Sequence, residues 1–163
     1  MSAPAFLAPA IEWWSALYGD HQAVSVAVRY LHLAAIVVGG GRAIAADLRA
    51  LRSVKGSEDA RRAALVETAS THRVVVPALA VVVATGALMA ASDVDTFLSS
   101  RAYWLKMGLF ALLLLNGGAL LASERAAGAG RPAGWPALRA ASAGSVALWL
   151  AVLLAGVWLT VAA

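Results

Sequence analysis

Apolar residues fill long blocks of this chain, and most charged residues lie between the blocks. A bilayer core about 30 Å thick needs about 20 residues of helix to cross it, and four blocks are long enough. The pattern therefore predicts an all-α fold, an integral membrane four-helix transmembrane bundle. The predicted spans cover residues 23–46, 73–91, 103–121 and 141–161.

The composition agrees with a membrane protein of one domain over residues 1–163. Hydrophobic residues make up 61% of the chain, charged residues 13%, and the mean hydropathy is +0.77. The absence of cysteine excludes disulfides and thiolate metal sites. The net charge of +4 comes from basic residues beside the apolar blocks, so it indicates topology and no nucleic-acid partner. The expected partner is the lipid bilayer, and a redox partner or a homo-oligomer is compatible with it.

A short apolar segment rich in aromatic residues precedes the first span. Pro4, Pro9 and Glu12 interrupt it, unlike the apolar region of a secretory signal, so we expect it to be retained. Indole and phenol rings favour the membrane–water boundary. The segment therefore predicts an N-terminal interfacial helix. Its anchoring side chains are Ile11, Trp13, Trp14, Leu17 and Tyr18.

Lysine and arginine are concentrated in the first and third loops, predicted at residues 47–72 and 122–140. The N-terminal segment has none, and the second loop has only Arg101. By the positive-inside rule both basic loops are cytoplasmic, so the N-terminus and the C-terminus lie outside a bacterial inner (plasma) membrane. Within the first loop, Gly56-Ser57 predicts a break, and Ser57 predicts the start of a helix.

His32 is an ionisable residue in the middle of an apolar span. A helical rise of about 1.5 Å per residue places it roughly 12 Å below the outer boundary of the core. An ionisable group at that depth is by default a functional hypothesis. His72 lies on the order of 18 Å away along the membrane normal, too far to share one haem iron or copper ion with His32. Two interpretations stay open: His32 is a ligand, or it is a neutral imidazole hydrogen-bonded to Thr85, Ser145 or a backbone carbonyl.

Among cofactors, a b-type haem fits the surroundings of His32 best. His32 would be the metal ligand and supply one axial nitrogen. Arg29 and Lys106 lie in the outer thirds of their spans, where they could neutralise the haem propionates. A methionine, Met107 or Met89, or a water molecule would take the other axial position. The predicted cofactor site therefore lies in the outer half of the bundle.

Gly39 and Gly40 follow His32 by two turns of helix. They would leave room for a flat macrocycle or allow close approach of a neighbouring helix.

All nine acidic residues are predicted to lie in loops or at span ends, which argues against a proton- or sodium-coupled transporter. Nucleotide-binding and hydrolase motifs are absent, so any chemistry would use a bound cofactor or a lipid-soluble substrate.

Several short motifs between residues 11 and 125 resemble an uncharacterised group of bacterial four-span membrane proteins related to CopD-like copper-resistance membrane domains. The motifs are Leu31-His32-Leu33, Gly39-Gly40 through Asp47-Leu48-Arg49, Thr85-Gly86 and Tyr103-Trp104-Leu105-Lys106. A weaker similarity is to the HemJ-type protoporphyrinogen oxidase, a haem-binding four-span protein with a histidine in its first span and a lysine in its third. His32 and Lys106 are the matching positions.

The sequence therefore predicts an inner-membrane four-helix protein that binds b-type haem or porphyrin in its outer half, for electron transfer or porphyrin redox chemistry. The alternative is a non-catalytic, CopD-like metal-handling module or an accessory membrane subunit, in which His32 is only a buried hydrogen-bonding group. Whether the protein is an enzyme stays open.

Overall fold

The computed structural model describes residues 8–53 and 56–162, so Lys55 of the predicted first loop and the first seven residues lie outside the described residues. Regular structure in the described part is entirely α-helical. Four helices are long and apolar enough to cross a membrane, which confirms the predicted fold. The helices are α1 (Ala8–Asp20), α2 (Gln22–Ser53), α3 (Glu58–Ser92), α4 (Val94–Ser99), α5 (Arg101–Gly128) and α6 (Gly134–Ala162).

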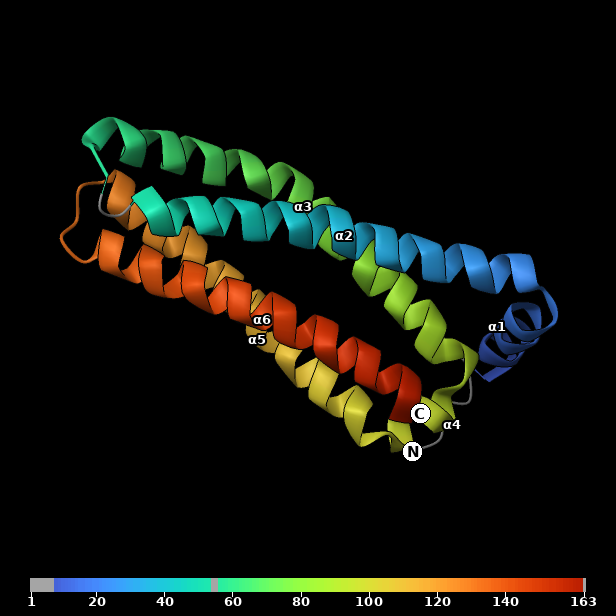
Figure 1. The fold of residues 1–163 in the computed structure, drawn as a ribbon. Coiled ribbons are helices and arrows are strands. Elements are labelled where there is room, and N and C mark those ends of the chain that lie inside the picture. Colours follow the sequence, from blue (N-terminus) through green and yellow to red (C-terminus); the bar gives the residue numbers. More distant parts are fainter. Residues whose placement is uncertain (1–7, 54–55, 163) are drawn as a thin grey trace.

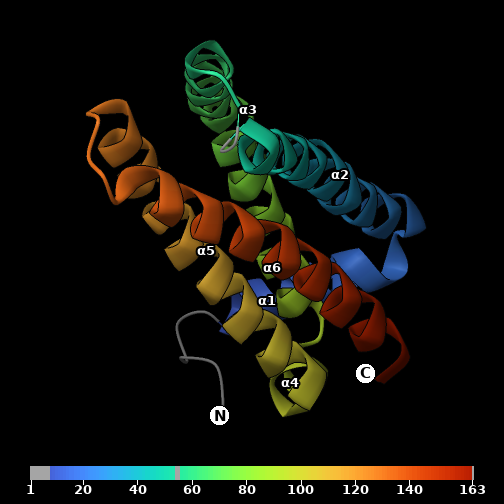
Figure 2. The ribbon, with the colours of Figure 1, turned by 60° about the vertical axis from the view of Figure 1, so that its left-hand side comes forward.

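The four long helices form two antiparallel hairpins, α2–α3 and α5–α6, and contact between α2 and α6 joins the hairpins (Figure 1; Figure 2). Helices α2 and α5 make no close contact with each other in the described residues, so they lie diagonally across the bundle. Helix α1 packs on α3 and α2 at the end of the bundle where α6 also ends. We call this the outer end, and the opposite end, with the α2–α3 and α5–α6 turns, the inner end.

Large apolar side chains point outward, and small polar side chains point into the bundle. Val37, Leu115 and Leu154 are each more than 70% exposed. So many exposed large apolar side chains are unusual for a water-soluble protein and are expected where lipid is the solvent. By the length and composition of its helices, the chain is a multi-pass membrane protein. The buried polar residues are His32, Asp47, Thr68, Thr71, Thr85, Ser123, Ser142 and Ser145.

The helices extend well beyond the apolar spans at the inner end. Helix α3 has 35 residues, a length of roughly 52 Å. The Ser57 side chain accepts a hydrogen bond from the Ala60 amide at 3.3 Å, which confirms the predicted helix start. Much of the predicted loops 47–72 and 122–140 is therefore helical. Hydropathy marks where a helix leaves the lipid, whereas the helix itself continues until a cap or a turn ends it.

Two short helices complete the outer end. The predicted N-terminal helix is present as α1, and it is fastened to the end of α3. The Trp14 indole donates to the Leu88 carbonyl and the Ser15 hydroxyl donates to the Ser92 carbonyl, both at 2.7 Å. Helix α4, which the sequence pattern did not predict, lies within the second loop. Asp93 caps it by accepting from the Thr96 amide at 3.2 Å.

Gly39 and Gly40 bring α2 close to two different helices. A Cβ atom on Gly39 would lie 2.7 Å from the Ala78 Cβ of α3, and one on Gly40 would lie 3.0 Å from the Trp149 ring of α6. Consecutive helical residues point about 100° apart, so each glycine serves one neighbour. Of the two roles predicted for this pair, the structure has the close helix approach. The expectation of room for a macrocycle is wrong at both positions, because Ala78 and Trp149 fill the space.

We predict that Gly39→Ala destabilises the bundle by about 1–3 kcal/mol, because the new methyl group overpacks the α2–α3 contact. Gly41→Ala is the matched control, since a Cβ atom there meets nothing within 4 Å. Thermal unfolding in detergent, followed by tryptophan fluorescence, measures both. Adding Ala78→Gly to Gly39→Ala should restore stability, and equal effects of the two single substitutions would contradict the packing assignment.

Candidate functional site

His32 and Gly39 lie on the same face of α2, and this face packs against α3. His32 precedes Gly39 by seven residues, two turns of helix, and therefore points in nearly the same direction. On antiparallel α3 the partner of His32 is Thr85, which follows Ala78 by the same seven residues. One helix register thus fixes both the glycine contact and the histidine contact.

The His32 imidazole is buried, and its Nδ1 atom lies 2.9 Å from the Thr85 hydroxyl oxygen. That hydroxyl donates its single hydrogen to the Val81 carbonyl at 2.6 Å, so it can only accept from His32. The proton of a neutral His32 is therefore on Nδ1, and Nε2 carries a lone pair. Within the described residues, Nε2 is buried and has no hydrogen-bond partner. The predicted hydrogen bond to Thr85 is confirmed, while one ring nitrogen stays available as a ligand.

Two other groups face His32. Gly86 of α3 lies beside the ring, and a Cβ atom there would sit 3.5 Å from the His32 Cε1. Lys106 of α5 is close enough for its charge to act on His32, and its ammonium group lies against Gly156 of α6, 3.7 Å from the position of a Cβ atom there. Within the described residues, no carboxylate forms an ion pair with Lys106. This outer-half region therefore presents a lone pair and an unpaired cation.

The remaining predicted site residues do not join this region. Arg29 is exposed, and its Nε atom donates to the Tyr18 hydroxyl of α1 at 3.2 Å. Met107 is half-buried on α5, the helix that does not touch α2. A pocket of about 520 Å³ lies at α4, lined by residues 95, 96, 98 and 99, and no predicted site residue lines it. The structure thus brings His32 and Lys106 together and leaves the other four candidates apart from them.

A second polar region lies in the inner half of the bundle, around Asp47. Asp47 follows Gly40 by seven residues and faces Ser142, which precedes Trp149 by seven, as well as Ser145. Asp47 is 2% exposed and Ser142 is 0% exposed. Within the described residues, the Asp47 Oδ1 and the Ser142 Oγ have no hydrogen-bond partner. Asp47 lies at the end of its predicted span, and because α2 continues past it, its carboxylate is buried inside the bundle.

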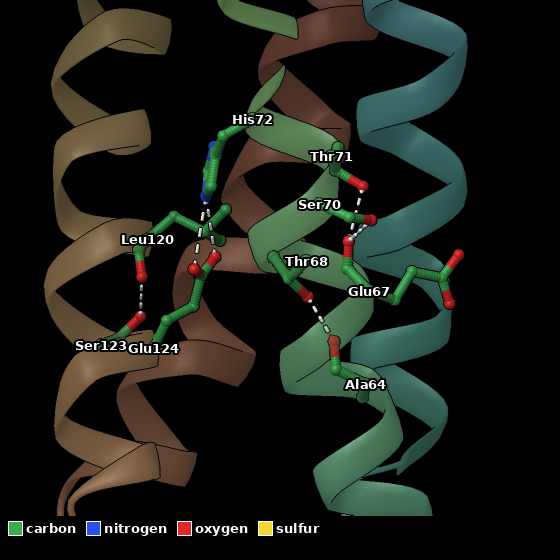
Figure 3. A network of polar contacts seen from close by, with 9 residues as sticks. All are labelled: Ala64, Glu67, Thr68, Ser70, Thr71, His72, Leu120, Ser123 and Glu124. Atoms are coloured by element: carbon green, nitrogen blue, oxygen red, sulfur yellow. Dashed lines mark hydrogen bonds and ion pairs between the residues drawn. The ribbon is translucent and has the colours of Figure 1, made fainter. Parts of the chain in front are cut away.

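His72 and Glu124 link the two hairpins near this region (Figure 3). The His72 Nε2 lies 3.3 Å from one carboxylate oxygen of Glu124 and 3.4 Å from the other. Both groups are close enough for their charges to act on Asp47. His72 of the α2–α3 hairpin thus contacts a carboxylate of the α5–α6 hairpin.

The nearest cations on α2 are already paired. Arg42 lies 3.8 Å from the Glu67 carboxylate of α3, and Arg49 also pairs with Glu67. Figure 3 shows Glu67 on the side of α3 away from Glu124. Asp47 therefore has no arginine or lysine ion-pair partner within residues 8–53 and 56–162.

An apolar cluster lies between the two polar regions along the bundle. Ala43, Leu113, Trp149 and Val152 form its buried centre. Along α2, Ala43 lies between His32 and Asp47. The outer and inner polar regions are therefore separated along the bundle.

Sequence reasoning missed the inner site because it treated residues 47–72 as a loop. The signal was present in the seven-residue spacing between Gly40 and Asp47, since a helix that continued past the apolar span would bury both on one face. The convergence of Lys106 with Gly156 carries no local signal, because these residues meet only through the α5–α6 register.

Neither region contains three histidine, cysteine, aspartate or glutamate side chains grouped to hold a metal ion, as far as the described residues go. Comparison of the chain with protein-family models, with curated proteins and with solved structures gave no match.

We predict that Thr85→Val lowers the free energy of unfolding by about 1–3 kcal/mol, because it removes the hydroxyl that faces the buried Nδ1–H of His32. In ¹⁵N NMR spectra of labelled protein, the wild type should show the Nδ1–H tautomer of His32, and the variant a mixture of tautomers. Thr68→Val is the matched control, since Thr68 donates to the Ala64 carbonyl in the same way but, within the described residues, makes no hydrogen bond to a histidine. An unchanged tautomer in Thr85→Val would contradict the assignment.

Proposed function

We propose that the protein binds a b-type haem or a related porphyrin in the outer half of its bundle, for electron transfer or porphyrin redox chemistry. The observation that carries the proposal is the His32 Nε2: a buried lone pair without a partner, on a ring whose other nitrogen is held by Thr85. A histidine that ligates a metal characteristically donates its second ring N–H to a fixed acceptor, and Thr85 is such an acceptor.

The surroundings of His32 offer one imidazole nitrogen as a metal ligand and one lysine that could contact an anionic group. Lys106, which has no ion-pair partner within the described residues, is close enough for its charge to act on His32, and it could neutralise a propionate. Gly86 keeps the α3 backbone close to the ring without a side chain in between. The residues that would hold the group are therefore His32, through Nε2, and Lys106, through its charge.

A haem would supply reversible one-electron chemistry at its iron. The chain's own contribution would be to hold the imidazole in one tautomer, to compensate negative charge through Lys106, and to exclude water. Water is excluded because His32 is buried and because apolar side chains surround the bundle on its lipid-facing side. The Thr85 contact at Nδ1 is expected to raise the basicity of Nε2.

For membrane placement, we propose a bacterial inner membrane with the inner end of the bundle in the cytoplasm. The arginines of the α2–α3 and α5–α6 turns gather at that end, and both described ends of the chain lie at the other (Figure 1). The positive-inside rule then puts α1 and the end of α6 outside.

The cytochrome proposal predicts Soret and α bands in a reduced-minus-oxidised visible spectrum of the detergent-purified protein, expressed with ample haem. His32→Ala should lose most of the bound haem, because it removes the proposed histidine ligand. His21→Ala is the matched control, since His21 is exposed at the start of α2, and it should keep the spectrum of the wild type.

Absence of the bands from the wild type would refute haem binding, and bands that survive His32→Ala would refute His32 as the ligand. Copper bound by a haem-free protein, and lost in His32→Ala, would instead favour the metal-handling alternative.

The orientation proposal predicts that alkaline phosphatase fused after residue 163 is active and that a fluorescent-protein fusion there is dark. The same two reporters inserted between α5 and α6, at residues 129–133, should give the reverse result. Equal behaviour at both positions would contradict the four-span topology.

A further inference from the structure

We infer that the inner half of the bundle holds a second site, in which the Asp47 carboxylate binds and releases a proton in exchange with the aqueous phase at the inner end. The site is independent of the proposed haem, because the apolar cluster around Trp149 separates the two regions. It is built from Asp47 of α2 and from Ser142 and Ser145 of α6.

The burial of Asp47 is the first argument. An ionised carboxylate taken out of water is unfavourable unless a cation or several hydrogen-bond donors compensate it. Asp47 is 2% exposed, its Oδ1 has no donor within the described residues, and it has no lysine or arginine ion-pair partner there. Protonation removes the charge, and the resulting O–H group can donate a hydrogen bond.

Ser142 supplies the second, independent observation. Its side chain is 0% exposed and its hydroxyl lies close to the Asp47 carboxylate, although the geometry falls short of a hydrogen bond. When Asp47 is protonated, one of its two carboxylate oxygens becomes an O–H donor. The Ser142 hydroxyl oxygen can accept this hydrogen bond. In the ionised state the same hydroxyl can donate back to the carboxylate. The serine can therefore serve both protonation states, as a proton-exchange site requires.

The charged groups around Asp47 provide a connection to water. No charged side chain of α6 is among the groups that act on Asp47; those that do are His72 of α3 and Glu124 of α5. These two contact each other at 3.3 Å and are partly exposed, with exposed side-chain fractions of 25% and 11%. In the exchange step, a proton from water forms an O–H bond at the Asp47 carboxylate, and the same bond breaks when the proton returns. The pair provides titratable groups between hairpins through which this transfer can pass.

A bound metal ion fits the site less well than a proton. A hard monovalent or divalent cation takes about six or more oxygen ligands. Asp47 and the two serines supply far fewer, and the described residues hold no metal-ligating group of three. The site is therefore assigned to a proton, and a sodium ion becomes an outcome of the test.

The experiment is an infrared titration of the full-length protein in nanodiscs. We expect a carbonyl-stretch band of a protonated carboxylic acid that appears and disappears reversibly with pH and shifts in D₂O. Asp47→Asn should abolish the band. Asp20→Asn, at the exposed end of α1, should leave it unchanged. Glu124→Gln should keep the band and slow its exchange with D₂O.

A second measurement avoids dependence on the folding of Asp47→Asn. In wild-type protein labelled with ¹³C-aspartate, the band should move to the labelled frequency, because the other described aspartates are exposed. A band that stays at the unlabelled position, or survives Asp47→Asn, would assign the proton to a glutamate and overturn the proposal. The proposal would also be overturned if no band titrated with pH. Loss of the band when Na⁺ replaces choline at constant pH would overturn it too, because the site would then bind sodium. Haem spectra are recorded on the same variants. They test the haem proposal separately, so a negative infrared result for Asp47 leaves the haem proposal standing, and the reverse also holds.

Discussion

The close approach of α2 to two neighbours is the constraint on which the rest of the bundle depends. Without a hydrophobic driving force between helices in lipid, small residues that let backbones meet become the main source of specific packing. Gly39 admits Ala78 of α3, and Gly40 admits Trp149 of α6. Because the two glycines are adjacent, α2 is held at two faces at one level, which fixes its rotation as well as its distance from each partner.

That rotation decides what both polar sites contain. One face of α2 carries His32 to Thr85, and the other carries Asp47 to the serines of α6. A rotation of α2 by one residue would turn both groups toward other neighbours or toward lipid, where an unpaired polar group is costly. The glycine pair and the two polar contacts therefore support one another, and a single register satisfies all of them.

The two sites differ in charge, and this difference organises the molecule along the membrane normal. The outer region combines an imidazole lone pair with the Lys106 ammonium, so it suits a ligand that carries a metal centre or negative charge. The inner region combines Asp47 with the His72–Glu124 pair, so it suits proton exchange. The apolar cluster between them leaves no polar side chain at its buried centre, which favours separate events at the two ends over a continuous path through the bundle.

Several features follow from the sequence alone because they depend on local patterns. Runs of apolar residues predicted the four spans, the serine at position 57 predicted the start of α3, and a histidine inside lipid required a polar partner, for which Thr85 was one of three candidates. Tertiary structure decided which candidate it is, that Asp47 is buried, that Arg29 turns to Tyr18, and that Lys106 reaches the region of His32. These facts depend on how helices far apart in the chain align face to face, and hydropathy along one helix contains no information about that alignment.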